Sequence, residues 1–270
     1  MINISDCAQR SERRLRKENQ DRCLSVISRI SPYGSRNVGV YVVCDGISHS
    51  NGGEAAKRAI QSLYASVGRI IGELSKADTL SDEAAMEERV ILQAGMTQAI
   101  LDADRLLRKW LNCGCTVSMA IAFDQCVYAA NVGDSPIFLL RRNPEGNWKM
   151  EELYVNHNEA GEMVRRGEIS SEEAVNAPEK NCLLRAVGVG EPLSQEDIPF
   201  LWADLEQESI LLIGSDGALS ALPMSRLEAL TDRTESKGME RLCNAIFTEV
   251  EATPAATDNF TLIAARILMG

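Results

Sequence analysis

The sequence lacks the features that would place the protein in a membrane or on a nucleic acid. No apolar run is long enough to span a bilayer, and Met1 to Arg16 lacks the apolar stretch of a signal peptide. Positive charge is not in excess, because 28 Lys and Arg stand against 39 Asp and Glu, a formal net charge of −11. An acidic chain repels nucleic acid and anionic lipid. We therefore expect a cytoplasmic protein with no nucleic-acid partner and no membrane partner.

Cysteine is present, but it is not arranged for a metal site. The eight cysteines are scattered, and Cys113 and Cys115 form the only close pair. Metal sites usually space their thiols by two or more residues and add a second pair or histidines, which this sequence does not supply. We expect reduced thiols, as in cytosolic proteins. The sequence also lacks a long linker, a low-complexity tract and an internal repeat, so one domain over residues 1–270 is the simplest interpretation.

The order of apolar patterns predicts an α+β fold. Hydrophobic residues make up 45% of the chain, enough for a sizeable core. Runs of strand length occupy residues 21–30, 38–44, 116–123, 126–130, 137–141, 148–155, 209–213 and 260–267, and helical patterns occupy 54–74, 83–111, 158–177 and 238–250. The strands after residue 115 are separated by turn signals, which predicts an antiparallel meander. Because strands and helices come in separate groups, we expect two stacked antiparallel sheets flanked by helices.

Four aspartates stand at the ends of predicted strands. Asp45 and Asp216 each follow an apolar run and precede a glycine, Asp258 precedes the last apolar run, and Asp21 opens an early strand. Grouped carboxylates repel one another unless cations are bound, and all-oxygen ligands select Mg²⁺ or Mn²⁺. A single Asp-Gly pair is most often only a turn. The repeated arrangement favours a metal site, although spacing alone does not bring the four together.

An ordered set of short motifs resembles the type 2C (PPM-type) metal-dependent protein phosphatase family in its bacterial form. Each motif is weak alone, but the set follows the family order from about residue 16 to 267. The matching segments are RKENQD at 16–21, DG at 45–46 with GGEAA at 52–56, GCT at 114–116, ANVGDS at 130–135, His157, GEI at 167–169, LRAVG at 184–188, SDG at 215–217 and TDN at 257–259. The resemblance implies two stacked antiparallel sheets with the metals in a cleft at one end.

The resemblance also implies a set of metal ligands. Asp45 would bridge two Mn²⁺ or Mg²⁺ ions, and Gly46 would add its carbonyl oxygen to one of them. Asp21, Asp216 and Asp258 would complete the second site. In this scheme a hydroxide shared by the two ions attacks phosphoserine or phosphothreonine directly, so no phosphoenzyme forms.

Three further residues have implied roles outside the two core metal sites. Asp134 would join Asp216 at a weakly held third ion, and the alternative is a plain turn aspartate. Arg16 would grip the substrate phosphate, and the alternative is a solvated arginine in a basic run. His49 would protonate the leaving oxygen, and a surface loop histidine is an equally good interpretation.

Some positions depart from the family pattern, and other functions stay open. Gln20 stands where the family has Glu, Pro136 where it has Arg, and Asn156 and Asn158 flank His157 in place of Asp and Ser. None of these changes removes a predicted core ligand. The alternatives are a regulatory pseudophosphatase and a small-molecule phosphatase on the same fold. The resemblance suggests phosphorylated proteins, a bacterial Ser/Thr kinase and its targets as partners, and we expect a monomer.

Overall fold

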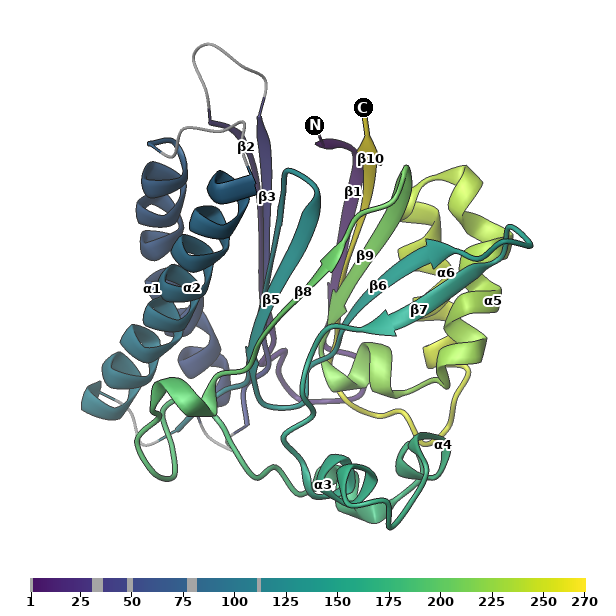
Figure 1. Ribbon diagram of the computed structural model, residues 1–270. Helices are drawn as coiled ribbons and strands as arrows, with labels where there is room; N and C mark the ends of the chain where they lie inside the picture. The colour runs from purple at the N-terminus through teal and green to yellow at the C-terminus, as the bar shows by residue number, and fades with distance from the viewer. Residues whose placement is uncertain (1, 31–35, 48–50, 77–81, 111–112) are drawn as a thin grey trace.

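Two five-stranded antiparallel sheets lie face to face in the middle of the molecule (Figure 1). The computed structural model describes residues 2–30, 36–47, 51–76, 82–110 and 113–270. The first sheet has the order β1 (Ile2–Glu12), β10 (Phe260–Met269), β9 (Glu208–Gly214), β6 (Ile137–Arg142) and β7 (Trp148–Glu152). The second has the order β2 (Arg22–Arg29), β3 (Asn37–Cys44), β4 (Val117–Phe123), β5 (Cys126–Val132) and β8 (Phe200–Asp204). The predicted fold class is confirmed.

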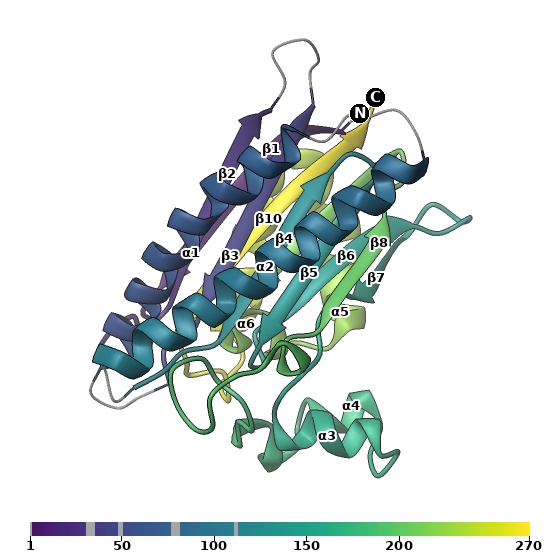
Figure 2. The same ribbon diagram turned by 60° about the vertical axis from the view of Figure 1, so that its left-hand side comes forward.

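Helices cover the outer faces of both sheets (Figures 1 and 2). The second sheet is covered by α1 (Gly52–Leu74) and α2 (Asp82–Trp110), and the first sheet by α5 (Met224–Thr234) and α6 (Met239–Glu251). α1 buries Ala55, Ala59, Leu63 and Val67, whose spacing of four residues places them on one face of the helix. In the described residues, none of the helices combines the length and hydropathy needed to cross a lipid bilayer.

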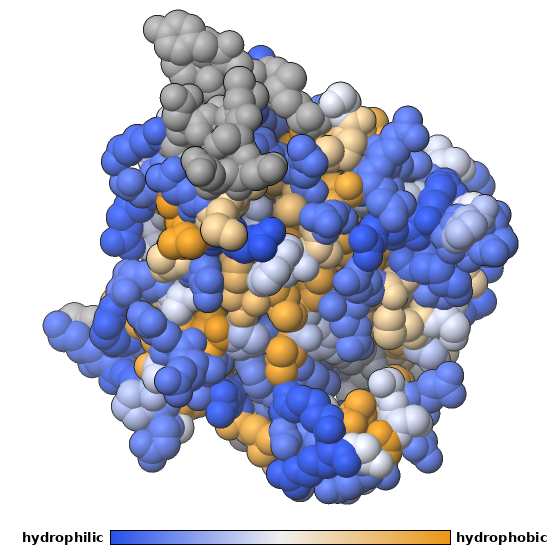
Figure 3. Space-filling model, in the orientation of Figure 1, coloured by the Kyte–Doolittle hydropathy of each residue, from blue (hydrophilic) through white to orange (hydrophobic). Residues whose placement is uncertain are grey.

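Three apolar clusters join the four layers. One lies between α1, α2 and the second sheet, another between the first sheet and α5 and α6, and the third between the two sheets. The inter-sheet cluster includes Tyr41, Val43, Leu139 and Ile263, all fully buried. In the view of Figure 3, apolar residues appear in the middle of the face, between the sheets, and hydrophilic residues cover the helical layers at the sides. Burial of these faces holds the strand ends in fixed positions.

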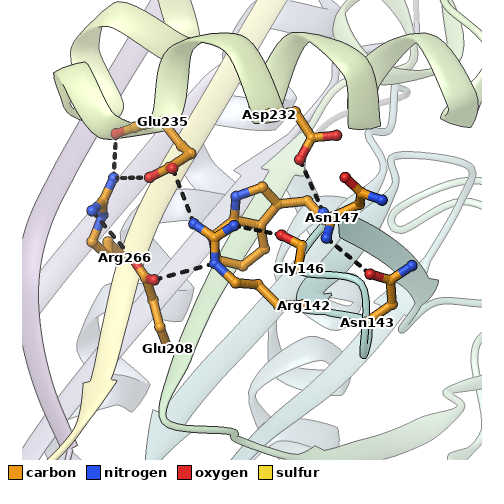
Figure 4. Close-up of polar contacts among 9 residues, drawn as sticks. Arg142, Asn143, Gly146, Asn147, Glu208, Asp232, Glu235 and Arg266 are labelled. Atoms are coloured by element: carbon orange, nitrogen blue, oxygen red, sulfur yellow. Dashed lines mark hydrogen bonds and ion pairs between the residues drawn. The ribbon is translucent and has the colours of Figure 1, made fainter.

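Ion pairs tie the first sheet to the end of α5 (Figure 4). Glu235 accepts from Arg142 of β6 at 3.0 Å and from Arg266 of β10 at 2.9 Å. Glu208 of β9 lies 3.2 Å from Arg266 and 3.6 Å from Arg142. β6 begins near Asp134 and ends at Arg142, so this network lies at the opposite end of the strand from the predicted site.

The predicted meander is wrong. β4 pairs with β5 in the second sheet, but β6 belongs to the first sheet, where it pairs with β7 and β9. The segment after β5 therefore crosses from one sheet to the other. β4, β5 and most of β6 are buried on both faces, so their residues show no alternation that would assign them to a sheet.

Three elements escaped prediction. β1 lies at a sheet edge and carries several polar residues, β8 is an edge strand of only five residues, FLWAD, and α5 has a polar sequence, MSRLEALTDRT. The helical pattern at 158–177 corresponds to two short helices, α3 (Glu159–Arg165) and α4 (Ser171–Ala174). These short helices lie beyond one end of the two sheets, at the bottom of Figure 1. The chain ends lie at the other end of the sheets (Figure 1).

Candidate metal centre

Strand pairing places Asp21 and Asp45 at the same end of the second sheet. Asp21 directly precedes β2 and Asp45 directly follows β3, and the neighbouring residues Arg22 and Cys44 are paired. The backbone N–H of Asp45 donates to Oγ1 of Thr116 at 3.0 Å, and its carbonyl accepts from the backbone N–H of Thr116 at 2.8 Å. The start of β4 therefore fixes the position of Asp45.

The first sheet contributes Asp216 and Asp258 in the same way. Asp216 follows β9 and Asp258 precedes β10, two antiparallel neighbours whose adjoining ends are paired. Ser215 and Thr261 exchange two hydrogen bonds: the N–H of Ser215 donates to the carbonyl of Thr261 at 2.9 Å, and Oγ of Ser215 accepts from the N–H of Thr261 at 3.1 Å. The two aspartates thus leave the sheet side by side.

Asp134 lies in the segment that crosses between the sheets. Ser135, the next residue, shares a hydrogen bond of 2.7 Å between its hydroxyl and that of Thr116, and its carbonyl accepts from Ser118 at 2.5 Å. Nδ2 of Asn158 donates to Oδ2 of Asp134 at 3.2 Å. Asp134 is therefore tied to β4 on one side and to the segment carrying α3 on the other.

The pKa values show that the aspartates act on one another. Burial raises the pKa of Asp45 well above its ordinary value, and the charges of Asp21 and Asp216 raise it further. Burial and then the charge of Asp216 raise the pKa of Asp134 to about 7. Burial, with a contribution from Asp216, also raises the pKa of Asp21 to about 6, while nearby hydroxyls partly offset it. Burial and the charge of Asp258 raise the pKa of Asp216. The five carboxyl groups therefore form one electrostatic cluster.

The cluster fits divalent cations. Asp21 is 1% exposed, and neither of its carboxylate oxygens has a hydrogen-bond partner within the described residues. Buried carboxylates without donors are costly, and hard cations with oxygen ligands relieve that cost. As the side chains lie, no three His, Cys, Asp or Glu residues in the described ranges form a group able to hold an ion. Asp134 accepts a hydrogen bond from Asn158, and Asp258 accepts one from Arg16.

The two glycines that follow aspartates are needed for close backbone packing. A Cβ atom at Gly46 would overlap with the backbone of Gly52, at the start of α1. A Cβ atom at Gly217 would overlap with the backbone carbonyl of Asn259. The Asp-Gly pairs thus bring segments of different elements together beside the carboxylates, and the proposed ligand role of the Gly46 carbonyl stays a prediction.

Arg16 lies at the rim of the cluster. Its Nη2 donates to Oδ2 of Asp258 at 2.5 Å, and its side chain is 52% exposed. The hydrogen bond and charge of Asp258 raise the pKa of Arg16, and the charges of Asp216 and Asp45 add to this. A guanidinium that is half exposed beside partly buried carboxylates offers its remaining donors to an anion arriving from solvent.

Asn259 is a positioning residue whose role the sequence did not indicate, although the residue belongs to the TDN motif at 257–259. Its Nδ2 donates to the carbonyls of Arg13 and Glu18, both at 2.9 Å, and its Oδ1 accepts from the N–H of Gln20 at 2.9 Å. Asn259 is 4% exposed. This one side chain therefore holds the loop that carries Arg16 against the start of β10.

His157 supports the crossing segment. Its Nδ1 accepts from the backbone N–H of Gly133 at 3.1 Å, and the backbone N–H of His157 donates to the carbonyl of Gly133 at 3.1 Å. Burial lowers the pKa of His157 to about 4, and the charges of Arg185 and Arg165 lower it further. The imidazole is therefore neutral at pH 7. His49, predicted as a proton donor, lies outside the described residues.

The chain is similar in sequence to known phosphatases. The model of the family described as protein phosphatase 2C matches residues 5–163. A serine/threonine phosphatase, stp, of Listeria welshimeri is 31% identical over 195 residues, which are 71% of this chain and 71% of that protein. The protein phosphatase PhpP of Streptococcus pneumoniae is 28% identical over 125 residues, 44% of this chain and 47% of that protein.

Solved structures share the architecture along nearly the whole chain. A PPM Ser-Thr phosphatase from Mycobacterium smegmatis, MsPP, in complex with cacodylate, has a TM-score of 0.70 at 25% identity, with 97% of this chain and 98% of that chain covered. The catalytic domain of PstP in complex with two manganese ions has a TM-score of 0.65 at 18% identity, with 99% of each chain covered. Because PstP is only 18% identical to this chain, the similarity between the two shows a shared fold and nothing more.

Proposed function

Since this chain belongs to the protein phosphatase 2C family, we propose that it hydrolyses phosphoserine and phosphothreonine in proteins, using divalent cations held by its aspartates. One observation carries the proposal: five aspartates from the ends of strands in both sheets meet in one electrostatic cluster. The family is metal-dependent, and its relative PstP was solved with two manganese ions. We propose one catalytic domain over residues 1–270.

The core ions would be held by residues from both sheets. Asp45 would bridge two Mn²⁺ or Mg²⁺ ions, with the carbonyl of Gly46 on one of them, and the remaining core ligands would be Asp21, Asp216 and Asp258. When bound, the ions supply positive charge to the phosphate and lower the pKa of the attacking water. The protein would contribute carboxylates at strand ends whose positions are fixed by the two sheets, so the backbone would reorganise little when the ions bind.

Arg16 would bind the phosphate of the substrate. Its guanidinium stands at the rim and is half exposed, so phosphate oxygens can reach it from solvent. A planar fork of N–H donors suits two oxygens of one phosphate. To donate to phosphate from both Nη atoms, the Arg16 guanidinium would have to weaken or break its hydrogen bond to Asp258. The Asp258 carboxylate would then be available to an ion.

Asp134 would hold a third, weakly bound ion together with Asp216. Its carboxyl group is within electrostatic reach of Asp216 and receives a hydrogen bond from Asn158. An ion with few protein ligands keeps several waters. Such a site would assist protonation of the leaving oxygen, the role alternatively assigned to His49.

The proposed biological setting follows the relatives. These relatives are bacterial proteins named serine/threonine phosphatase or protein phosphatase. We therefore propose phosphorylated proteins as substrates, together with a bacterial Ser/Thr kinase that acts on the same targets. We further propose a monomer that works in signalling in the cytoplasm.

Metal-dependent turnover of a phosphopeptide tests the proposal. Purified protein should release phosphate from a phosphothreonine peptide with added Mn²⁺ or Mg²⁺ and lose this activity with a chelator. Phosphosugars at the same concentration should react much more slowly. Turnover of phosphosugars in preference to the peptide would replace the protein substrate with a small molecule, and hydrolysis of neither would contradict the proposal.

A further inference from the structure

A cavity of about 450 Å³ is lined by residues between 155 and 199, among them His157, whose neighbour Asn158 donates a hydrogen bond to Asp134. Its lining includes the apolar side chains of Val155, Leu184 and Pro199. Leu184 is 52% exposed, which is unusual for a leucine in this molecule. The cavity therefore has an apolar wall that is open to solvent and is covered by nothing in the described part of the chain.

A buried histidine supplies a directed hydrogen-bond donor to this cavity. His157 lines the cavity and is 6% exposed. Because Nδ1 accepts from the N–H of Gly133, the proton of the neutral imidazole is on Nε2. Among the described residues, no acceptor pairs with this N–H. The N–H of Nε2 is therefore available to a carbonyl or other acceptor of a ligand in the cavity.

Five charged residues line the cavity, and one of them, a glutamate, has no ion pair in the described part of the chain. Arg165 is hydrogen-bonded to Glu162, and Arg185 lies 2.8 Å from Asp197. Glu162 also pairs with Arg166, at 3.1 Å, so the carboxylates of Glu162 and Asp197 are both neutralised by arginines. Glu196 lines the cavity, is exposed and has no ion pair within the described residues. It is therefore the carboxylate at the rim that a cation arriving from solvent can pair with.

We propose that this cavity binds a lysine or arginine side chain of the protein substrate, beside the phosphorylated residue. The apolar wall suits the methylene stem of such a side chain, and Glu196 at the rim suits its cationic end. The N–H of His157 suits a backbone carbonyl of the same peptide. An acidic side chain or a second phosphate would instead meet an unpaired carboxylate, so the charge selects against it.

The cavity is attached to the metal centre by two contacts. His157 accepts a hydrogen bond from Gly133, the residue before Asp134, and the neighbouring Asn158 donates a hydrogen bond to Asp134 itself. A peptide whose phosphate reaches the aspartates can therefore place a neighbouring side chain against Glu196. This inference rests on the proposed function and adds a sequence preference to it.

Paired phosphopeptides test the preference. A phosphothreonine peptide carries lysine, norleucine or glutamate at one neighbouring position at a time, and kcat/KM is measured with Mn²⁺. At one position or more, lysine should exceed norleucine by about two- to fivefold, as expected for an ion pair at a surface, and glutamate should be poorest. The ratio for lysine over norleucine should fall towards one in E196Q. The control E191Q removes an exposed carboxylate that does not line the cavity, and it should keep the ratio.

The outcomes separate this inference from the proposed function. Hydrolysis of all peptides with equal kcat/KM would overturn the basic side-chain site and leave the phosphatase function intact. A lysine preference that E196Q and E191Q leave unchanged would place the site elsewhere and overturn the assignment to this cavity. Hydrolysis of none of the peptides would overturn both.

Discussion

Arg16 donates a hydrogen bond of 2.5 Å from Nη2 to Oδ2 of Asp258, although the two residues are 242 positions apart in the chain. The bond joins the proposed phosphate ligand to a proposed metal ligand. It brings a positive charge to the edge of the carboxylate cluster, where the charges of Asp216 and Asp45 also act on Arg16. The proposed phosphate site and the proposed metal site are therefore adjacent.

Arg16→Ala should raise KM for a phosphopeptide, by about tenfold if one charge-assisted contact is lost. The effect on kcat should be smaller, because the phosphate is held similarly in the ground and transition states. Steady-state kinetics at saturating Mn²⁺ measure both values. The matched control is Lys17→Ala, which removes an exposed cation from the same loop. An unchanged KM in Arg16→Ala would make Arg16 a solvated residue whose partner is only Asp258.

Asp134→Ala should keep the fold and lower kcat on a phosphopeptide more than on an activated aryl phosphate. The alkoxide of serine or threonine is a poor leaving group and depends on proton donation, whereas an aryl oxide leaves readily. The comparison of kcat on the two substrates checks this. Equal losses would indicate that Asp134 acts through the core ions, and no loss on either substrate would make it a turn residue.

His157 should make stability depend on pH. Its pKa is about 4 in the folded protein and near 6.5 when unfolded, so the unfolded chain takes up the proton first. The contribution of the buried, neutral imidazole to the free energy of unfolding is complete above pH ~6.5 and is lost as the pH falls towards 4. Between about pH 7.5 and about pH 5 the folded state should lose about 2 kcal/mol through this residue.

Denaturant unfolding of wild type and His157→Gln at both pH values measures the effect. The aspartates titrate in both proteins, so the difference between the two proteins isolates His157. The variant should show the smaller decrease in the free energy of unfolding at low pH. Equal decreases in the two proteins would contradict a neutral, buried imidazole.

Asn259→Ala should affect both stability and substrate binding. It removes three hydrogen bonds between Asn259 and the loop before β2, at a cost of about 2–4 kcal/mol. Because the loop carries Arg16, KM for a phosphopeptide should rise even where the variant is fully folded. Unfolding midpoints and KM measured at low temperature check the two effects separately. A stability loss with an unchanged KM would show that Arg16 is positioned without Asn259.

The strand ends were predictable, and the contacts between distant segments were not. The apolar runs before Asp45 and Asp216 end sharply at a charged residue, so the sequence locates each carboxylate within its element. The pairing of β3 with β2 and of β9 with β10 then brings them together. Antiparallel neighbours place the end of one strand beside the start of the next, which is why carboxylates that a local pattern places at strand ends lie together in the fold.

The assignment of strands to sheets depends on tertiary packing. Cys126–Val132 and Ile137–Arg142 both read as buried strands, and only their partners place them in different sheets. The partners of Asn158 and Asn259 are equally invisible in the sequence, because asparagine at a loop predicts only a turn or a cap. The cavity beside His157 combines residues from three separate segments, so no motif predicts it.

The most direct test of the account is Mn²⁺ binding and turnover by Asp45→Ala beside wild type. Calorimetric titration should show at least two ions bound by wild type and loss of tight binding in the variant, which should remain folded by circular dichroism because like-charge repulsion also falls. kcat on a phosphothreonine peptide at saturating Mn²⁺ should fall at least ~100-fold, about 2.7 kcal/mol of transition-state stabilisation. Near-native turnover by Asp45→Ala with two ions still bound would contradict the assignment of the aspartate cluster as the metal centre.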